Sequence, residues 1–294
     1  MTTALAAAHV AVDQPLDLPL TLESGQAFRW HNDGGVWSGF IEGRLLTLER
    51  DADGLRVTFD PDAHPDAVRA VRDYFRLDDD LPAIYAHLCE DERLSAAVHQ
   101  HWGLRILRQD PWECLIAFIC SQNSNIPRIA KMQETLADTL GESVTLGALT
   151  RRAFPTPSAL ASAGETRLRE LGLGYRAKYV APTAEAVAAG GVDLHALRAV
   201  PYEDAKAALV ALRGVGEKVA DCVLLFALDQ LDAAPIDRWV RRALEDWYLD
   251  GRRLSYRDLW AWTREAFGPY AGYAQQYLFF RRRETARTKG EAES

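Results

Sequence analysis

The feature of this sequence that most constrains its fold is a change in the spacing of apolar residues near position 66. Between about 20 and 60, apolar and polar residues alternate in QAFRW, VWSGFI, RLLTLER and LRVTFD, separated by NDGG, EG and DADG. Alternation interrupted by Asp-Gly and Gly-Gly is typical of antiparallel β-hairpins. From there onward apolar residues recur at helical spacing, as in AVRAVRDYFR and PWECLIAFICSQ. We therefore expect an α+β fold in which a small antiparallel β-sheet domain precedes a mainly helical body.

The expected domain boundary falls between residues 107 and 108. Residues 1–107 are assigned to the sheet domain and residues 108–294 to the helical domain, whose helices are separated by FPTPSAL, GLGYR and FGPYAG. The chain has 294 residues, of which 48% are hydrophobic, and this supplies enough apolar material for a core. We expect a folded protein with two domains that exists as a monomer.

Charge and cysteine content restrict the classes of function. The net charge is −8 and the isoelectric point about 5.4, which taken alone argues against nucleic acid as partner, because Lys and Arg supply most nonspecific affinity for phosphates. The four cysteines form no CxxC pair and no compact cluster, so we expect no metal site, no iron–sulfur cluster and no other cofactor. No segment reaches the roughly 20 apolar residues that cross a bilayer, and the first residues lack a basic signal-peptide start. The expected location is the cytoplasm, with no membrane contact.

Residues 202–228, YEDAKAALVALRGVGEKVADCVLLFAL, predict two helices joined by a short turn. Both helical segments are apolar on one face, and the turn carries Gly214 and Gly216. These glycines permit a tight reversal, and the backbone N–H groups that start the second helix then form a phosphate site without a basic side chain. The turn answers part of the objection raised by the acidic composition. A structural cation at this phosphate site is left open.

Lys218 and Asp237 are the candidates for catalysis. Lys218 follows the turn, and its plain interpretation is a surface lysine at the start of a helix. Asp237 lies in PIDRWV, and its plain interpretation is the N-cap of a helix. A second helix of about ten residues followed by a loop would bring Asp237 back beside the turn. An amine that attacks C1′ of a nucleotide as the base leaves, beside a carboxylate that stabilises the cationic sugar, suits covalent base removal. The imine formed then permits elimination of the 3′ phosphate.

Several separated motifs resemble those of one enzyme family. The turn LRGVG resembles the helix–hairpin–helix of DNA repair and replication proteins. The segments QDPWECLIAFICSQNSNIPRI, LGLGYRAKYV, GVGEKVADCVLLFALD and PIDRWV resemble, in order and spacing, the 8-oxoguanine DNA glycosylases of eukaryotic type, which belong to the helix–hairpin–helix glycosylase superfamily. The resemblance runs from SGQAFRW to FGPYAGYAQQYLF. It implies a bifunctional DNA glycosylase and AP lyase that acts on double-stranded DNA containing oxidised guanine, in the nucleoid of a prokaryote or the nucleus of a eukaryote.

Within this resemblance Lys218 matches the nucleophile that forms a Schiff base, and Asp237 matches the essential aspartate. Gly25 matches a glycine whose backbone carbonyl accepts a hydrogen bond from N7–H of the oxidised base; unmodified guanine has no proton there, so this one acceptor discriminates between them. Gln275 matches the glutamine that reads the Watson–Crick edge of the base. The residues that match the pair enclosing its ring are Cys222 and Phe279.

A second group matches residues that hold the duplex and fill the gap left by the extruded base. Asn123 matches the residue in the gap, with Tyr175 wedging beside it, and Arg128 and Arg176 match arginines that read the orphaned cytosine. Trp239 departs from the family, which usually has a histidine there that contacts a phosphate near the lesion. Arg238 beside it is the candidate for that contact. The arginines expected on the DNA-facing side are Arg128, Arg176, Arg213, Arg238, Arg241 and Arg242.

Each of these positions also has a plain structural interpretation, because glycines form turns, Cys and Phe fill cores, and Arg, Asn and Gln end helices or face solvent. The functions left open are a related glycosylase for another damaged purine and a noncatalytic helix–hairpin–helix protein that only grips phosphates. Lys218 argues against monofunctional alkyl-purine enzymes, which generally lack it. The missing four-cysteine cluster argues against the pyrimidine-repair and adenine-mismatch branches.

Overall fold

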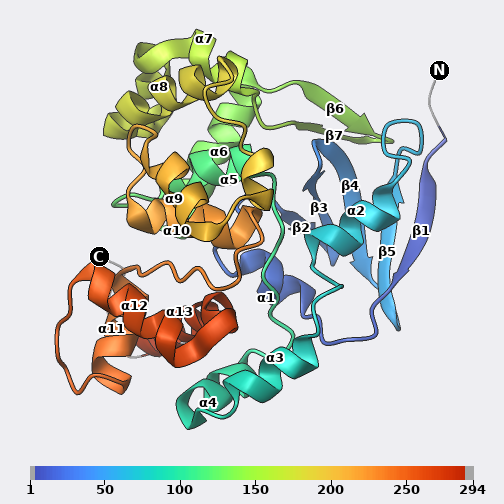
Figure 1. Cartoon of the computed structure of the whole chain (residues 1–294). Helices are drawn as coiled ribbons and strands as arrows, with labels where there is room; N and C mark the ends of the chain where they lie inside the picture. The colour runs from blue at the N-terminus through green and yellow to red at the C-terminus, as the bar shows by residue number, and fades with distance from the viewer. Residues whose placement is uncertain (1–3, 289–294) are drawn as a thin grey trace.

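The computed structural model describes residues 4–288, which form a β-sheet part and a helical part lying side by side (Figure 1). The sheet has five antiparallel strands in the order β1–β5–β4–β3–β2. Leu48 stands opposite Trp37 on one side and Val57 on the other, and all three are buried. The strands are β1 Ala6–Ala11, β2 His31–Asp33, β3 Val36–Ile41, β4 Arg44–Arg50 and β5 Gly54–Phe59.

Two features of the sheet part differ from the sequence prediction. The strand β1 was not expected, and it pairs along its length with β5. The segment QAFRW at residues 26–30 is not a strand but an extended link after the short helix α1, Leu18–Glu23. Gln26 fixes this link, because its buried side chain donates to the carbonyls of Thr21 and Arg105 and accepts the N–H of Leu107.

The helix α2, Ala67–Tyr74, covers one face of the sheet (Figure 1). Its buried side chains Ala67, Ala70 and Val71 join those of the strands in one apolar core. Leu107 belongs to this core, whereas residues 81–106 contribute to the separate core of the helical part. The domain boundary at residues 107 and 108 stays a prediction.

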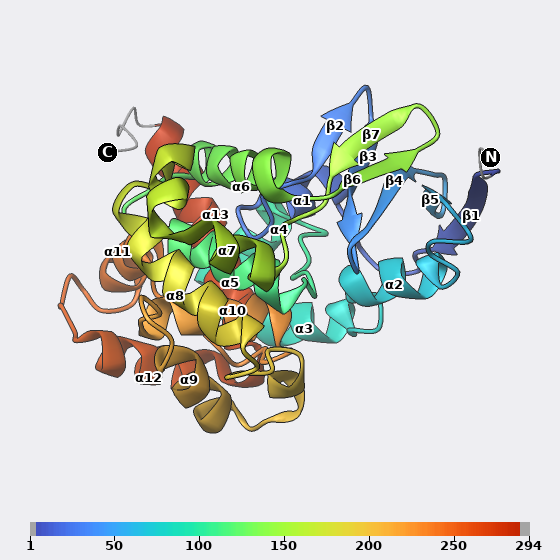
Figure 2. The same cartoon turned by 90° about the horizontal axis from the view of Figure 1, so that it is seen from above.

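The helical part is built around α5, whose residues are all buried except Glu113. Asp110 caps α5 through its side chain, and Pro111 occupies the first turn, where no N–H partner is needed. Figures 1 and 2 show α5 next to α10 in the middle of the helical part. The helices are α3 Leu81–Leu88, α4 Glu92–Gln100, α5 Pro111–Cys120, α6 Ile126–Leu140, α7 Pro157–Leu168, α8 Ala177–Ala188, α9 Tyr202–Val210, α10 Glu217–Ala227, α11 Arg238–Trp247, α12 Tyr256–Phe267 and α13 Ala271–Thr288.

The predicted α+β class is confirmed, and so is the helix–turn–helix expected at residues 202–228, which is formed by α9 and α10. A short hairpin of β6, Ser143–Leu146, and β7, Leu149–Arg152, was not expected among the helices. It reaches toward the sheet, where β6 approaches β4 (Figure 2). Within residues 4–288 none of the helices has the length and apolar character needed to cross a membrane.

Candidate active site

The turn between α9 and α10 sets the position of the α10 N-terminus. Gly214 has a φ of +86°, and a Cβ there would lie 2.4 Å from the Tyr179 side chain, so this position requires glycine on both grounds. Gly216 is the extended N-cap of α10, and a Cβ there would meet no described atom within 4 Å. The surrounding atoms therefore require glycine at position 214, whereas position 216 has room for a larger side chain. Among the described residues no side chain caps α10, which leaves its first N–H groups for the predicted phosphate.

Lys218 lies in the first turn of α10, and its side chain points into the protein rather than along the surface. Its Nζ donates to Ser121 Oγ at 3.3 Å and lies 5.1 Å from the centre of the Phe118 ring. Ser121 ends α5 and Phe118 lies in its last turn, so the packing of α5 against α10 fixes the amine. The surface interpretation of Lys218 is therefore wrong.

Asp237 is both the N-cap of α11 and part of the surroundings of Lys218. Its Oδ1 accepts the N–H groups of Trp239 and Val240, each at 2.8 Å. Burial raises the pKa of this carboxyl, while those two N–H groups and the positive charge of Lys218 partly oppose the rise. The capping role of Asp237 is therefore observed, and its role in catalysis stays a prediction.

Lys218 and Asp237 line one cavity of about 670 Å³, here called the Lys218 cavity. It is bounded by the residues after α1, the α5–α6 loop and the helices α10, α11 and α13. Most of the predicted site residues meet there: Gly25, Asn123, Arg128, Lys218, Cys222, Asp237, Arg238, Gln275 and Phe279. The predicted residues outside its lining are Tyr175, Arg176, Gly214 and Gly216.

The predicted base-binding residues lie at one end of this cavity. Gly25 has a φ of +85°, and a Cβ there would approach Ile126 Cδ1 to 2.4 Å and Phe279 Cε1 to 3.9 Å. Gln275 is buried, and its Oε1 has no hydrogen-bond partner among the described residues, an arrangement that favours a ligand with an N–H donor. Burial raises the pKa of the Cys222 thiol to about 11 although Lys218 opposes this, so Cys222 is a neutral wall and not a nucleophile.

The α5–α6 loop brings three predicted DNA-contacting residues together. Asn123 is exposed with a φ of +48°, and its Nδ2 donates to Tyr175 Oη at 3.2 Å. Tyr175 Oη in turn donates to the Gln122 carbonyl. Arg176 is only 1% exposed, and its guanidinium donates to the carbonyls of Gln122 and Asn123. The solvent-facing interpretation of Arg176 is wrong, and its reading of cytosine stays a prediction, because its donors hold the loop in this structure.

The expected arginine face is only partly formed. Arg176 is buried, and Arg241 is bonded to Glu245 and to the Leu254 carbonyl. Trp239 is buried, with the guanidinium groups of two exposed arginines 4.8 and 5.7 Å from the centre of its ring. These two, Arg238 and Arg242, are one helical turn apart at the start of α11. The exposed members of the expected set are Arg128, Arg213, Arg238 and Arg242.

Comparison with known families decides among the open functions. Residues 9–115 match the model of the 8-oxoguanine DNA glycosylase N-terminal domain, and residues 116–265 match that of the HhH-GPD superfamily of base excision DNA repair proteins. The chain belongs to the 8-oxoguanine DNA glycosylase family. Membership in this family confirms the predicted resemblance. It also excludes the alternative of a noncatalytic helix–hairpin–helix protein, since the chain is a DNA N-glycosylase with lyase activity.

Individual relatives agree with this assignment. The N-glycosylase/DNA lyase OGG1 of Arabidopsis thaliana is 36% identical over 280 residues, which cover 90% of this chain and 76% of the relative. A probable N-glycosylase/DNA lyase of Methanothermobacter thermautotrophicus is 32% identical over 290 residues, covering 90% and 92% of the two chains. The 8-oxoguanine glycosylase/lyase of Clostridium acetobutylicum, solved with double-stranded DNA containing cytosine opposite 8-oxoguanine, is 30% identical with a TM-score of 0.85, covering 92% and 93%.

Some residues that hold the candidate site together were missed from the sequence. Ser121 and Phe118 hold the Lys218 amine, and the Gln122 Nε2 donates to the Gly214 carbonyl at 3.0 Å, tying the α5–α6 loop to the hairpin turn. All three occur in the segment QDPWECLIAFICSQNSNIPRI, but its spacing does not show which of them meet α10. The only available signal was the position of Phe118 and Ser121 three residues apart on one helix.

Asp221 was also missed, although it lies three residues after Lys218 on α10. It is fully buried, and it accepts hydrogen bonds from Tyr202, from Tyr256 at 2.8 Å and from Lys206. Burial raises the pKa of Asp221, and Lys206 opposes that rise. This network ties α9 and α12 to the helix that carries Lys218.

Proposed function

We propose that the chain removes 8-oxoguanine from double-stranded DNA through a covalent intermediate on Lys218. The activity is that of its family: release of the oxidised base, followed by cleavage of the strand at the abasic site. The observation that carries the proposal is the convergence of the Lys218 amine and the buried Asp237 carboxyl on one cavity. The Clostridium relative, solved on a duplex with cytosine opposite 8-oxoguanine, supports double-stranded DNA as the partner.

In the proposed reaction one nucleotide flips out of the duplex into the Lys218 cavity, and its unstacking and unpairing cost a few kcal/mol. The neutral amine of Lys218 bonds to C1′ as the bond from C1′ to N9 breaks, and the base leaves with the electron pair and takes a proton. The Asp237 carboxylate stabilises the positive charge that develops on the sugar and activates the amine by accepting the proton that the amine loses as it attacks. Opening of the sugar ring then gives an imine between Lys218 and C1′. Loss of a proton from C2′ breaks the bond from C3′ to oxygen and nicks the strand 3′ of the lesion.

Recognition of the base is assigned to the other end of the cavity. The Gly25 carbonyl accepts N7–H, which oxidised guanine has and guanine lacks, and the unpaired Gln275 Oε1 accepts an N–H of the Watson–Crick edge. Cys222 and Phe279 enclose the ring from two sides. A base that lacks the matching N–H leaves a polar group of the site unpaired, and the free-energy cost of that unpaired group discriminates 8-oxoguanine from guanine.

Contacts to the duplex surround the cavity mouth in this proposal. Asn123 fills the gap and Tyr175 wedges beside it. The first N–H groups of α10 hold one phosphate, and Arg238 contacts a phosphate near the lesion. No step needs a metal or a cofactor, and a cation at the hairpin phosphate remains a prediction. The enzyme acts where the genome lies, in a nucleoid or a nucleus.

A related damaged purine is the second candidate substrate, and the observation that favours it is the stacking of Trp239 with two arginines where the family usually has a histidine. Single-turnover release of base separates the two. The substrates are duplexes with 8-oxoguanine opposite each of the four bases, with undamaged guanine and with an alkylated purine. We expect 8-oxoguanine to be released fastest, with loss of release in Lys218→Gln and no change in Lys131→Gln, an exposed lysine on α6. Faster release of the alkylated purine would overturn the specificity.

A further inference from the structure

One buried hydrogen-bond donor of the Lys218 cavity is not used by the proposed function. Gln276 of α13 lines this cavity and is 3% exposed, and its Nε2 has no hydrogen-bond partner among the described residues. Buried polar groups without partners are costly and rare, so such a group indicates a ligand that completes it. Because an amide nitrogen only donates hydrogen bonds, the missing partner is an acceptor.

The neighbours of Gln276 place it between the two ends of the cavity. The helix α13 packs against α11, the helix that Asp237 caps. Gly272, one turn before Gln276, donates its N–H to the Leu231 carbonyl at 2.8 Å, in the segment that leads to Asp237. Phe279, nearly one turn after Gln276, lies at the base-binding end. A donor between these two ends lies where the base of a bound nucleotide joins its sugar.

The base contacts assigned above leave one edge of the purine without a partner. The Gly25 carbonyl is assigned to N7–H, and Gln275 Oε1 to the Watson–Crick edge. The remaining edge carries N3, which is a hydrogen-bond acceptor. N3 is joined through C4 to N9, the atom whose bond to C1′ breaks beside Lys218. The acceptor that Gln276 lacks and the edge that has no partner therefore belong to the same part of the cavity.

We propose that Gln276 donates a hydrogen bond from Nε2 to N3 of the flipped purine and is a further catalytic residue. As the bond from C1′ to N9 breaks, the electron pair passes to the base and is shared between N9 and N3 through C4. The hydrogen bond to N3 becomes stronger as this negative charge develops, so it stabilises the transition state more than the bound substrate. Gln276 keeps its own protons, and the base takes its proton as in the reaction above. The orientation of the base rests on the proposed function.

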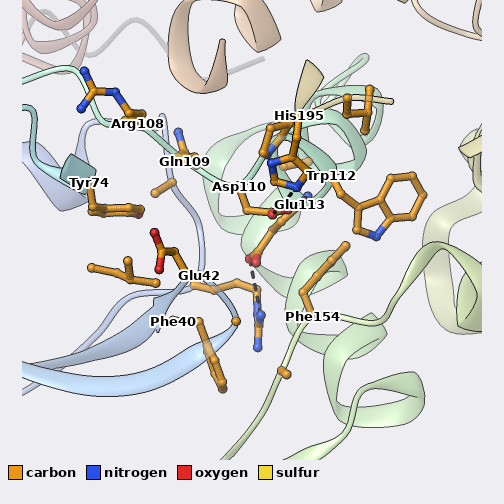
Figure 3. Close-up of a pocket in the computed structure, with 18 of the residues that line it drawn as sticks. Phe40, Glu42, Tyr74, Arg108, Gln109, Asp110, Trp112, Glu113, Phe154 and His195 are labelled. Atoms are coloured by element: carbon orange, nitrogen blue, oxygen red, sulfur yellow. Dashed lines mark hydrogen bonds and ion pairs between the residues drawn. The ribbon is translucent and has the colours of Figure 1, made fainter. Parts of the chain in front are cut away.

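A glutamine in another cavity supplies a matched control. That cavity has a volume of about 990 Å³ and lies between the sheet and the helical part, where Figure 3 shows Glu113 and the rings of Tyr74 and Phe40 around it. Gln133 of α6 lines it and is fully buried, and it does not belong to the lining of the Lys218 cavity. Gln133→Met therefore makes the same chemical change away from the catalytic residues.

Single-turnover release of 8-oxoguanine from a duplex measures the contribution of Gln276. Gln276→Met nearly keeps the length of the side chain and removes the donor, so base release should fall by about 10- to 100-fold. Gln133→Met should release the base at the wild-type rate. An unchanged rate in Gln276→Met would overturn the proposal, whereas no release of 8-oxoguanine by the wild-type protein would overturn the proposed function on which it rests.

Strand cleavage at a preformed abasic site separates this role from a structural one. No purine is present in that substrate, so Gln276→Met should cleave it at the wild-type rate. A loss equal to that in base release would mean that the substitution damages the cavity as a whole, and would refute the assignment. Gln276→Met should also unfold at no lower urea concentration than wild type, because it removes an unpaired buried amide.

A purine analogue tests the atom that accepts the hydrogen bond. In 3-deaza-8-oxoguanine a C–H group replaces N3, so wild type and Gln276→Met should release this base at equal rates. Gln276→Glu is a second variant of nearly the same shape, which places a carboxylate acceptor opposite N3 and should slow release of 8-oxoguanine at least as much as Gln276→Met. If Gln276→Met still released the 3-deaza base more slowly than wild type, N3 would not be the partner of Gln276, and the proposal would be wrong.

Discussion

Substitution of Gly25 by alanine tests how closely the base-binding end of the Lys218 cavity is built. At a φ of +85°, an alanine costs about 1–2 kcal/mol relative to glycine. Its Cβ would also lie 2.4 Å from Ile126 Cδ1, which is the end of a half-buried side chain and can turn away for about 0.5–1.5 kcal/mol. We therefore expect Gly25→Ala to lower the free energy of unfolding by about 1.5–3.5 kcal/mol, measured by urea denaturation.

The same substitution should also slow catalysis. The new methyl group and the displaced Ile126 side chain enter the space beside Phe279, which is 3.9 Å from the Cβ position. We expect single-turnover release of 8-oxoguanine to fall by at least about tenfold, equivalent to about 1.4 kcal/mol in the barrier. Gly251→Ala is the matched control, because Gly251 has a φ of +77° but no described atom within 4 Å of its Cβ position.

The comparison of these two variants separates conformational strain from recognition. Gly251→Ala should lose about 1–2 kcal/mol of stability and keep the wild-type rate of base release. If Gly25→Ala also kept the wild-type rate, the role assigned to the Gly25 carbonyl in recognition would be refuted.

Three further substitutions have defined expectations. Asp237→Asn keeps a capping side chain, and because burial raises the folded pKa of the Asp237 carboxyl above its unfolded value, the charged carboxylate costs stability at pH values above the folded pKa. At pH 7.5 the variant should therefore unfold at no lower urea concentration than wild type, while base release falls by at least about 100-fold. An unchanged rate of base release would exclude the carboxylate from catalysis. The wild-type rate should fall on acidification at a pH above the usual aspartate range. Arg176→Lys should lose about 1–3 kcal/mol of stability, measured in urea, because lysine cannot hold two carbonyls with a planar fork; a neutral result would mean the loop is held by other contacts. Asp221→Ala should lose about 3–5 kcal/mol in thermal unfolding, since it removes the fully buried partner of the half-buried Lys206 and leaves that ammonium without its acid. A loss below about 1 kcal/mol would contradict this.

The sheet strands could be predicted from the sequence only where side chains alternate clearly. The segments VWSGFI, RLLTLER and LRVTFD became β3, β4 and β5, because one face of each is apolar and Gly-containing turns separate them. The strand β1, AAAHVA, is rich in alanine, a weak strand former, and its pairing with β5 depends on contacts distant in sequence. QAFRW alternates in the same way as a strand, yet the buried Gln26 side chain binds backbone groups and keeps it out of the sheet.

In the candidate site, too, the residues that depend on local sequence could be predicted, and those that depend on contacts distant in sequence could not. Lys218 and Asp237 could be found because turn, helix and cap follow each other in sequence, and their spacing returns the carboxyl to the turn. Arg176 was expected to contact DNA, but its burial depends on how the α5–α6 loop folds back on it, which no local pattern encodes. Ser121 and Asp221 were missed for the same reason, since their partners lie on other helices.

Mass spectrometry of a borohydride-trapped complex tests the central claim most directly. The protein is incubated with a duplex carrying 8-oxoguanine opposite cytosine, borohydride reduces any imine to a stable amine, and digestion identifies the lysine attached to the sugar. We expect the adduct on Lys218 alone, and no adduct in Lys218→Gln at a protein concentration where Lys131→Gln is fully trapped. An adduct on another lysine of the wild-type protein, or release of base without any adduct, would contradict covalent catalysis by Lys218.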